Sequence, residues 1–542
     1  MYRPQQRSGL PALLLALLCG LLGTAQAQAA PLASAQTSLA SAQTPLAGLA
    51  QTPLASAQAP DSLRYPKREF RGAWFPTVTN RTWKTMTQAQ IRADILATLD
   101  SLAAVHCNAV LFQVRPQADA FFPSDLEPWS RFITGEQGKA PDPLWDPTAF
   151  VIEACHERCM EMHAWINPYR VTSNEEEVLA KDHLFYKKPN LFVKYGKQRY
   201  FNPGEPQARA HVVAVIADLV RRYDVDAVHF DDYFYPYRIE GKEFPDEATF
   251  QKYRKADGFA PDEKENWRRH NVNRMVQTLN DTIKAIKPWV KFGISPFGVW
   301  RNASDDALGS PTQAGQTNYD DLYADVRLWC KEGWIDYNVP QLYWIIGHPL
   351  ADYEPLIYWW SANSFGVNLY IGQSLSAILD AKMPDGSTQD QLYRKMQLVR
   401  EDPDVHGNVW WPGTGLVHSP RMMDSLRVEY QRYPALVPQY ATIDTVPPAP
   451  VCALQIADGV LTWQPTPADQ PLDETVYYGI YRVEGPNGAL SGGTPSCRLV
   501  AVVRHPLYAL PKADLSNAGG VRYGVTALDR LQNESTPQWI DL

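Results

Sequence analysis

The chain has 542 residues, more than one hydrophobic core normally organises, so we expect at least two folded domains. Its formal net charge is −8 and no block of lysines and arginines occurs, which argues against a nucleic-acid-binding protein. Aromatic residues are abundant instead, with 17 tryptophans and 27 tyrosines. Their flat rings could stack on sugars, although packing in a core is their more common use.

The N-terminus has the layout of a cleaved signal peptide. Arg3 and Arg7 precede an apolar run over residues 10–22, and two overlapping Ala-Gln-Ala sequences follow. The run is too short to span a bilayer with ease, and small residues at these spacings are typical of a cleavage site. We therefore expect residues 1–29 to be removed and the protein to be exported, to the periplasm or cell envelope.

A lipid anchor is the alternative at the same end of the chain. Cys19 lies inside the apolar run, but Leu18 occupies the position where a lipoprotein signal has a small residue, so the anchor is not favoured. No other segment is long and apolar enough to cross a membrane, so we expect no transmembrane segment in the mature chain. Residues 30–63 repeat Ala, Ser, Gln, Thr and Pro and are predicted to form a low-complexity linker.

From residue 64 to about 440, apolar strand-like runs alternate with longer amphipathic segments. The predicted strands are residues 69–78, 108–114, 161–166, 225–230, 291–294, 334–342, 367–371 and 407–411. The predicted helices include residues 87–105, 205–223, 265–286, 319–332 and 389–400. This alternation indicates parallel strands with crossover helices, and eight strands suit an α/β fold of the (β/α)8 TIM-like barrel type. A doubly wound open sheet is the alternative, but no glycine-rich phosphate loop follows the first strand.

A proline-rich linker at residues 446–450 separates the barrel from a β-rich tail. Its predicted strands are residues 460–463, 476–483, 498–503 and 521–528. Short strands with turn residues between them predict a small all-β sandwich over residues 446–542. Trp463, Tyr481 and Tyr523 are its expected core aromatics.

The cysteines give two further hypotheses. Cys155 and Cys159 lie four residues apart on a predicted helix, close to two histidines, which suggests zinc. One helical turn without a second cysteine pair is not a zinc-site spacing, so we predict no metal and no cofactor. Cys452 and Cys497, both in the tail, could form a disulfide or could simply be buried.

Reactive groups of a TIM barrel collect at the C-terminal ends of its strands, which makes Asp231 and Asp232 the candidate catalytic residues. Glycosidic hydrolysis normally uses two carboxyl groups. Neighbours at a strand end point to opposite sides, so they make an awkward pair of nucleophile and acid across one bond. They suit another mechanism, in which one protonates the leaving oxygen and the other orients an attacking substrate acetamide. That mechanism implies an N-acetylated sugar.

Two alternatives remain open for this pair. In an ordinary two-carboxyl mechanism the partner must come from another strand end, and Asp119 and Glu205 are the candidates. In a structural role, one aspartate caps the next element or forms an ion pair with Arg115 or Arg170.

Further polar and aromatic side chains follow the other strands and are predicted to bind substrate. They are Arg115, Asp119, Asn167, Tyr169, Tyr235, Tyr237, Trp300, Gln341, Tyr343 and Trp344. The rings could stack on sugars and the polar groups could bind hydroxyls, while plain packing and support of loop backbone are the alternatives. The sequence contains no nucleotide-binding loop, HExxH helix or serine nucleophile elbow, so those reaction classes are not supported.

Several motifs, in chain order, resemble the bacterial glycosyl-hydrolase-like 10 family. They are REFRGAW at 68–74, FQVRP at 112–116, HFDDYFYPY at 229–237, FGISPFG at 292–298 and WIDYNVPQLYW at 334–344. The resemblance covers the whole predicted barrel. It implies a TIM-like barrel that hydrolyses peptidoglycan glycan strands from which the stem peptides have been removed. Both sugars of peptidoglycan are N-acetylated, which fits a mechanism through a substrate acetamide.

The tail resembles a fibronectin type III module through LTW at 461–463, GIYR at 479–482 and YGVTALD at 523–529. Such modules usually space or bind and seldom catalyse. The family's members are often lipoproteins, and the sequence around Cys19 departs from that. We expect cell-wall glycan strands as the partner. The alternatives are a glycan-binding protein without activity and a hydrolase of another extracellular polysaccharide.

Overall fold

The computed structural model describes residues 64–542 except 79, 81, 485–496 and 517–519. The predicted signal peptide, the linker and the lipid-anchor candidate Cys19 therefore lie outside the described residues. Within the described part of the chain, no helix has the length and apolar character that a bilayer crossing needs.

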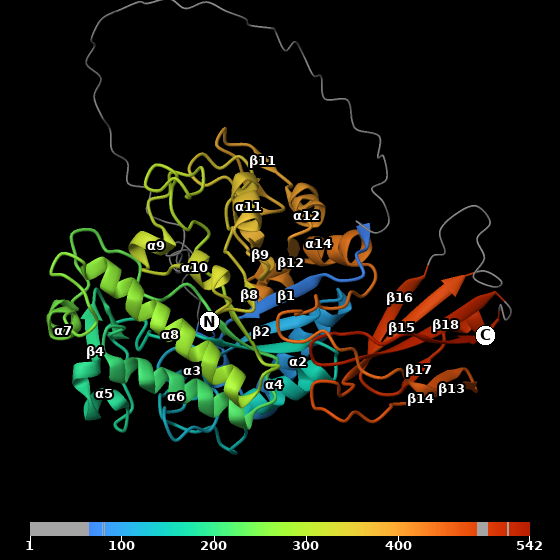
Figure 1. Cartoon of the computed structure of the whole chain (residues 1–542). Coiled ribbons are helices and arrows are strands. Elements are labelled where there is room, and N and C mark those ends of the chain that lie inside the picture. The colour runs from blue at the N-terminus through green and yellow to red at the C-terminus, as the bar shows by residue number, and fades with distance from the viewer. Residues whose placement is uncertain (1–63, 79, 81, 485–496, 517–519) are drawn as a thin grey trace, which may run out of the picture. The chain divides into compact units, whose positions relative to one another are not determined.

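Eight parallel strands close into a barrel in the order β1-β12-β9-β8-β7-β6-β3-β2, which confirms the predicted (β/α)8 fold (Figure 1). The strands are β1 (Phe70–Phe75), β2 (Ala109–Arg115), β3 (Glu161–Ile166), β6 (Ala227–Phe230), β7 (Lys291–Ile294), β8 (Tyr337–Asn338), β9 (Asn368–Ser374) and β12 (Val405–Trp411). Seven predicted strands match to within a few residues. The one predicted at 334–342 is reduced to two residues. On its N-terminal side Trp334 N bonds back to Trp329 O at the end of α10, and on its C-terminal side Pro340 has no amide hydrogen to donate.

Helices surround the barrel (Figure 1). The longer ones are α2 (Gln88–Ala104), α4 (Pro147–His156), α6 (Pro206–Arg222), α8 (Lys264–Ile286), α11 (Tyr353–Ala362) and α12 (Leu392–Glu401). The single helix predicted at 319–332 is wrong, since this segment forms α9 (Asn318–Asp321) and α10 (Val326–Lys331). Tyr323 has a left-handed φ of 52° between them, and the Asp325 side chain caps α10 by accepting from Leu328 N.

Shorter elements fill the loops between these strands and helices. They are η1 (Trp83–Thr85), α3 (Arg131–Thr134), α5 (Leu184–Lys187), η2 (Pro189–Leu191), β4 (Phe192–Tyr195), β5 (Gln198–Phe201), α7 (Glu247–Tyr253), η3 (Leu375–Ala377), β10 (Ala381–Lys382), β11 (Thr388–Gln389), α13 (Gly413–Leu416), α14 (Pro420–Ser425) and η4 (Leu426–Tyr430). The β4–β5 hairpin was not predicted from the sequence.

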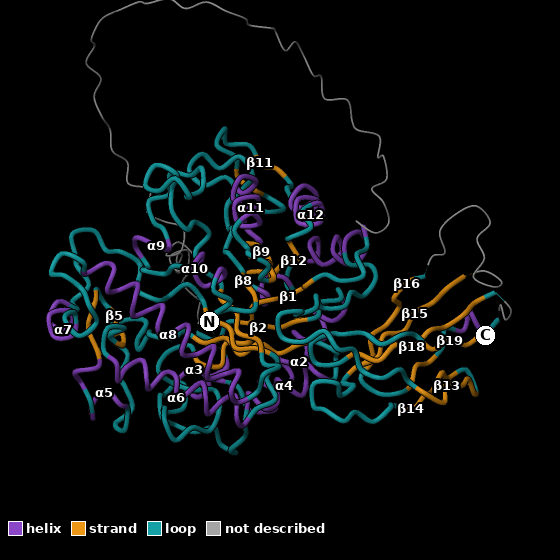
Figure 2. The backbone as a smooth tube through the Cα atoms, viewed as in Figure 1, coloured by secondary structure: helices purple, strands orange, loops and turns teal. Residues whose placement is uncertain are grey.

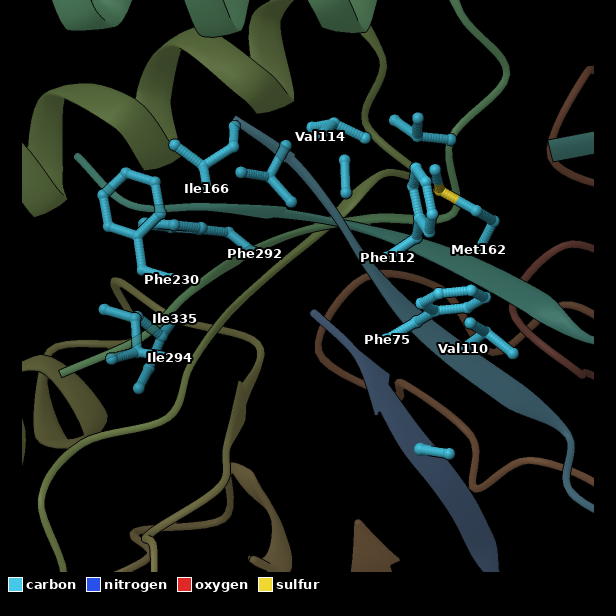
Figure 3. Close-up of a cluster of buried hydrophobic side chains, with 14 of the residues drawn as sticks. Phe75, Val110, Phe112, Val114, Met162, Ile166, Phe230, Phe292, Ile294 and Ile335 are labelled. Atoms are coloured by element: carbon cyan, nitrogen blue, oxygen red, sulfur yellow. The ribbon is translucent and has the colours of Figure 1, made fainter. Parts of the chain in front are cut away.

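The barrel has two apolar layers because side chains alternate along each strand. Outward-facing residues such as Phe75, Phe112 and Phe230 pack in the main core cluster (Figure 3). Inward-facing residues such as Trp165 and Tyr337 fill the barrel interior. The barrel interior is therefore a packed core, and in TIM barrels of this kind functional groups are found at the strand ends.

The C-terminal domain consists of two antiparallel sheets (Figure 2). One contains β13 (Cys452–Ala457), β14 (Val460–Gln464) and β17 (Leu507–Ala509), and the other contains β16 (Arg498–Val503), β15 (Tyr477–Glu484), β18 (Val521–Leu528) and β19 (Gln538–Asp541), with α15 (Lys512–Leu515) beside them. Trp463 and Tyr523 lie in the core cluster of this domain, as predicted. Tyr481 instead packs in a second cluster with Leu436.

The cysteines of the tail were expected either to form a disulfide or to be buried, and neither is observed. Cys452 and Cys497 are exposed free thiols, neither bonded nor buried. Cys155 is buried in α4, and burial raises the pKa of its thiol. Across the described ranges, no group of three or more His, Cys, Asp or Glu side chains is arranged to hold a metal ion.

The C-terminal domain packs against the barrel. Leu531, in the loop after β18, is fully buried in the interior cluster beside Val437 and Tyr440. Arg530 forms an ion pair of 2.7 Å with Asp224, just before β6. These contacts lie at the N-terminal end of the barrel, so the opposite end, where the strands finish, is left for the candidate site.

Candidate active site

Asp231 and Asp232 follow β6 directly, at the C-terminal end of the barrel. Alternation along the strand gives Ala227, His229 and Asp231 the same inward direction. Both aspartates are almost completely buried, with 5% and 2% of their surfaces exposed. Two neighbouring carboxyl groups are thus held largely out of water at the end of the barrel where TIM-barrel enzymes place their chemistry.

Asp231 accepts hydrogen bonds from N–H groups. Trp165 Nε1 donates to Oδ2 over 3.1 Å, Asn167 Nδ2 lies 3.3 Å from both oxygens, and the backbone N of Tyr233 is 3.4 Å from Oδ1. Burial raises the pKa of Asp231 above its ordinary value, and the charge of Arg170 and these donors only partly offset that rise. Because an N–H group needs an acceptor, the arrangement favours the ionised carboxylate.

Asp232 has a different environment. Burial, and then the negative charge of Asp231, raise its pKa to about 7, against weaker lowering by hydrogen bonds from Tyr237 and Gln341. Tyr237 donates its hydroxyl to Asp232 Oδ2. The two adjacent carboxyls therefore differ: Asp231 accepts several N–H groups, while Asp232 titrates near neutral pH. Pairs separated in this way are typical of an acid and its partner.

Tyrosines border the pair on one side. Tyr237 stacks on Tyr233 with ring centroids 5.4 Å apart and an angle of 25° between planes. The guanidinium of Arg170 lies 5.2 Å over the Tyr233 ring. Arg170 also donates to the carbonyl of Pro116, and its charge lowers the pKa of Asp231.

Several predicted binding residues lie around the same pair. Asn167 and Tyr237 bind the aspartates directly, and Gln341 is a hydrogen-bond partner of Asp232 that also donates to Ser295 O over 3.0 Å. Tyr343 is partly buried, and after burial the charge of Asp232 is the largest influence that raises its pKa. Trp344 is partly exposed and packs edge-on against Phe297, whose ring also contacts Tyr237.

The other predicted binding residues support loops and packing. Arg115 forms an ion pair with Glu127 and donates to Pro168 O over 3.2 Å. Tyr235 donates to Asp246 over 3.3 Å, and Trp300 donates to Asp325 over 3.2 Å. Tyr169 is buried, and its hydroxyl has no hydrogen-bond partner among the described residues. None of the contacts described for these residues involves either aspartate of the pair.

The two candidate partner carboxyls have hydrogen-bond partners of their own. Asp119 is fully buried and accepts from Gln137 over 3.2 Å, and burial raises its pKa to about 6. Glu205 precedes α6 and accepts from the hydroxyl of Tyr253 over 3.0 Å. Neither Asp231 nor Asp232 is among their described partners.

Trp165 is a site residue that the sequence interpretation missed. It lies within an apolar strand, yet its indole donates to Asp231. The signal that could have found it is the alternation in β3, because Trp165 lies two residues before Asn167 and shares its inward face.

The chain is similar to known glycosyl hydrolases. A family model described as Glycosyl hydrolase-like 10 matches residues 69–391. Glycosyl hydrolase YngK of Bacillus subtilis (strain 168) is 43% identical over 482 residues, covering 86% of this chain and 92% of that protein. Glycosyl hydrolase DigH of Escherichia coli (strain K12) is 35% identical over 378 residues, covering 65% of this chain and 84% of that protein.

Solved structures show more distant likeness. The catalytic domain of β-amylase from Paenibacillus polymyxa has a TM-score of 0.45 at 12% identity, covering 68% of this chain and 98% of its own. The glycoside hydrolase domain of PgaB (BpsB) from Bordetella bronchiseptica has a TM-score of 0.44 at 11% identity, covering 67% and 99%.

Proposed function

We propose a substrate for this chain, which belongs to the glycosyl hydrolase-like 10 family and is a glycoside hydrolase. The proposed substrate is a glycan strand of N-acetylated sugars, namely peptidoglycan without its stem peptides. The proposal includes export to the periplasm or cell envelope, where this polymer lies. It also takes the C-terminal domain as a fibronectin type III-like module. The observation that carries the proposal is the unequal environment of the two adjacent carboxyls.

In the proposed reaction, Asp232 is the general acid and Asp231 orients the substrate. Ionised Asp231 accepts from the acetamide N–H, which turns the acetamide oxygen toward the anomeric carbon. That oxygen bonds to the carbon as the glycosidic bond breaks, and the leaving oxygen takes the Asp232 proton. Water then attacks the anomeric carbon and returns a proton to Asp232, and the cyclic intermediate opens to release the free sugar end.

The geometry supports this division of labour. A neutral acid beside the leaving oxygen needs a raised pKa, and Asp232 has a pKa of about 7. A positive charge develops on the acetamide as it attacks, and an adjacent carboxylate stabilises it without a change of its own protonation. Adjacent side chains suit these two tasks, because neither has to approach the anomeric carbon from the opposite face.

The test compares peptidoglycan with and without stem peptides. Purified protein is incubated with intact and with amidase-treated peptidoglycan, beside Asp231→Asn and Asp232→Asn, and the released fragments are analysed by mass. The proposal predicts disaccharide-based products from amidase-treated strands only, and loss of these products in both variants. No release by the parent protein, with the protein still sedimenting with the glycan, would instead indicate a binding protein.

A further inference from the structure

Four aromatic side chains, here named the mouth aromatics, lie beside the aspartate pair at the C-terminal end of the barrel. They are Trp74 of β1, Trp165 of β3, Tyr343 after β8 and Trp411 of β12. Trp165 donates to Asp231, and the charges of Asp232 and Asp231 raise the pKa of Tyr343 after the effect of burial. Two of the four mouth aromatics, Trp165 and Tyr343, are therefore close enough to interact with the carboxyls.

Trp411 is held from two directions. Trp165 meets it at a centroid distance of 6.0 Å and an angle of 78°, and Trp74 meets it at 6.3 Å and 77°. Trp165 and Trp74 are buried, with 6% and 3% of their surfaces exposed, whereas Trp411 is partly exposed. Two edge-to-face contacts fix the orientation of its ring, and its exposed part remains available to a ligand.

A chain of buried polar groups fixes Trp74. Its indole N–H donates to His229 Nε2 over 3.2 Å, and His229 Nδ1 lies 3.1 Å from the hydroxyl of Tyr337. That hydroxyl lies 2.8 Å from His163 Nδ1, and His163 Nε2 lies 2.8 Å from Glu161. Burial keeps the pKa of His229 well below its ordinary value, so its single proton is on Nδ1 and every donor finds an acceptor.

The sheet also leaves room for the Trp74 ring. A Cβ at Gly372 would lie 3.1 Å from Trp74 and 3.1 Å from the carbonyl oxygen of Pro340. The backbone of β9 can approach the indole because residue 372 has no side chain. Three neighbouring strands, β1, β9 and β12, thus cooperate to orient one partly exposed ring.

We propose that Trp411 is the platform on which the sugar ring at the cleaved bond stacks. This inference rests on the proposed function and names the residue that binds its substrate. A pyranose has an apolar face of C–H groups that packs on a flat indole, and a preoriented ring binds it at little entropic cost. Trp165 contacts both Asp231 and Trp411, so a sugar stacked on Trp411 lies within reach of the carboxyls.

The test measures binding separately from turnover. Trp411→Ala, Trp411→Leu and Trp411→Phe are made in an Asp232→Asn background, and the affinity for soluble glycan strands from amidase-treated peptidoglycan is measured by calorimetry. Trp539→Ala is the matched control, because this tryptophan of the C-terminal domain is 36% exposed. Thermal unfolding of each variant shows that it is folded. If the alanine variant does not fold, the leucine and phenylalanine variants still show whether binding depends on an aromatic ring or only on an apolar side chain of similar size.

The platform predicts that Trp411→Ala and Trp411→Leu bind about tenfold more weakly or worse, whereas Trp411→Phe stays within about threefold of the parent. Trp539→Ala should bind like the parent. Equal affinity of the folded leucine and phenylalanine variants would overturn the proposal that Trp411 stacks on the sugar. The proposed hydrolase function would be unaffected. Absence of binding by the Asp232→Asn parent would overturn the proposed function, and the platform with it.

Discussion

At the scale of single residues, the proposed acid Asp232 affects the stability of the protein through its raised pKa. Folding raises its pKa from an ordinary value of 3.8 to about 7, so the folded protein holds a proton that the unfolded chain releases over this range. The contribution of this group to stability is therefore fully present below about pH 4 and is lost as the pH rises to about 7.

Asp232→Asn should therefore be more stable than the parent at pH 8. A shift of this size corresponds to roughly 2 to 4 kcal/mol of unfolding free energy, since one pKa unit is about 1.4 kcal/mol. The amide cannot ionise, and its oxygen still accepts from Tyr237. Denaturant unfolding of both proteins at pH 4 and pH 8 measures the difference, which should vanish at the lower pH. A variant that is less stable at both values contradicts this prediction.

Tyr237 affects the same proton. Its hydroxyl donates to Asp232 and lowers the pKa of that carboxyl, so Tyr237→Phe should raise this pKa. Activity that needs protonated Asp232 then persists to higher pH, and the alkaline limb of the kcat profile should move upward. We expect kcat at its optimum to fall about tenfold as the acid weakens and loses its orientation. An unmoved alkaline limb would show that Tyr237 has only a structural role.

At the scale of elements, β7 and β8 require close approach inside the barrel. A Cβ at Gly293 would lie 2.0 Å from the ring of Tyr337. The hydroxyl of this tyrosine is hydrogen-bonded to both His163 and His229. Gly293→Ala should cost about 1 to 3 kcal/mol, because the ring cannot move without breaking these hydrogen bonds. Urea unfolding measures the loss, and Gly315→Ala, with nothing within 4 Å, is the control.

The elements were largely predictable because strands buried on both faces are continuous apolar runs bounded by turns. β3 and β7 match their predicted ranges. The exceptions depend on backbone details that periodicity does not contain. The break between α9 and α10 rests on a left-handed residue, Tyr323, and the short β8 rests on Pro340 and on its neighbours in space.

The place of the two candidate aspartates after a strand was predictable, but the difference between their environments was not. It depends on Trp165 and Asn167 from β3 on one side, and on Tyr237 and Gln341 on the other. These groups are up to about a hundred residues from the pair in sequence, and their contacts arise only when the barrel closes. The ion pair of Arg115 with Glu127 was likewise not predictable from its position at a strand end.

At the scale of the whole molecule, the C-terminal domain is part of the barrel's support. Leu531 is completely buried among the interior side chains of the barrel, and Arg504 forms ion pairs with Glu153 and Glu157 of the barrel. The proline-rich linker suggested a separate module that spaces or binds. The contacts instead indicate that the domain closes the end of the barrel opposite the aspartates.

Leu531→Ala should therefore destabilise the barrel as well as its own domain. Removal of a fully buried leucine side chain costs about 2 to 5 kcal/mol, since a cavity is left among rigid neighbours. Calorimetry should show the transition of the barrel at lower temperature. Leu507→Ala, at a residue that is 54% exposed, should leave the transition nearly unchanged. A barrel transition unmoved by Leu531→Ala would show that the two domains are energetically independent.

The central claim is that Asp232 is the acid and Asp231 the orienting base of one glycosidase site. Its most direct test compares both asparagine variants on peptide-free glycan strands and on a short glycan with a dinitrophenyl leaving group, which needs no proton. Asp232→Asn should lose roughly 10² to 10⁴ of kcat on the strands and keep most activity on the aryl substrate. Asp231→Asn should lose activity on both. Equal losses of the two variants on both substrates would contradict the assignment.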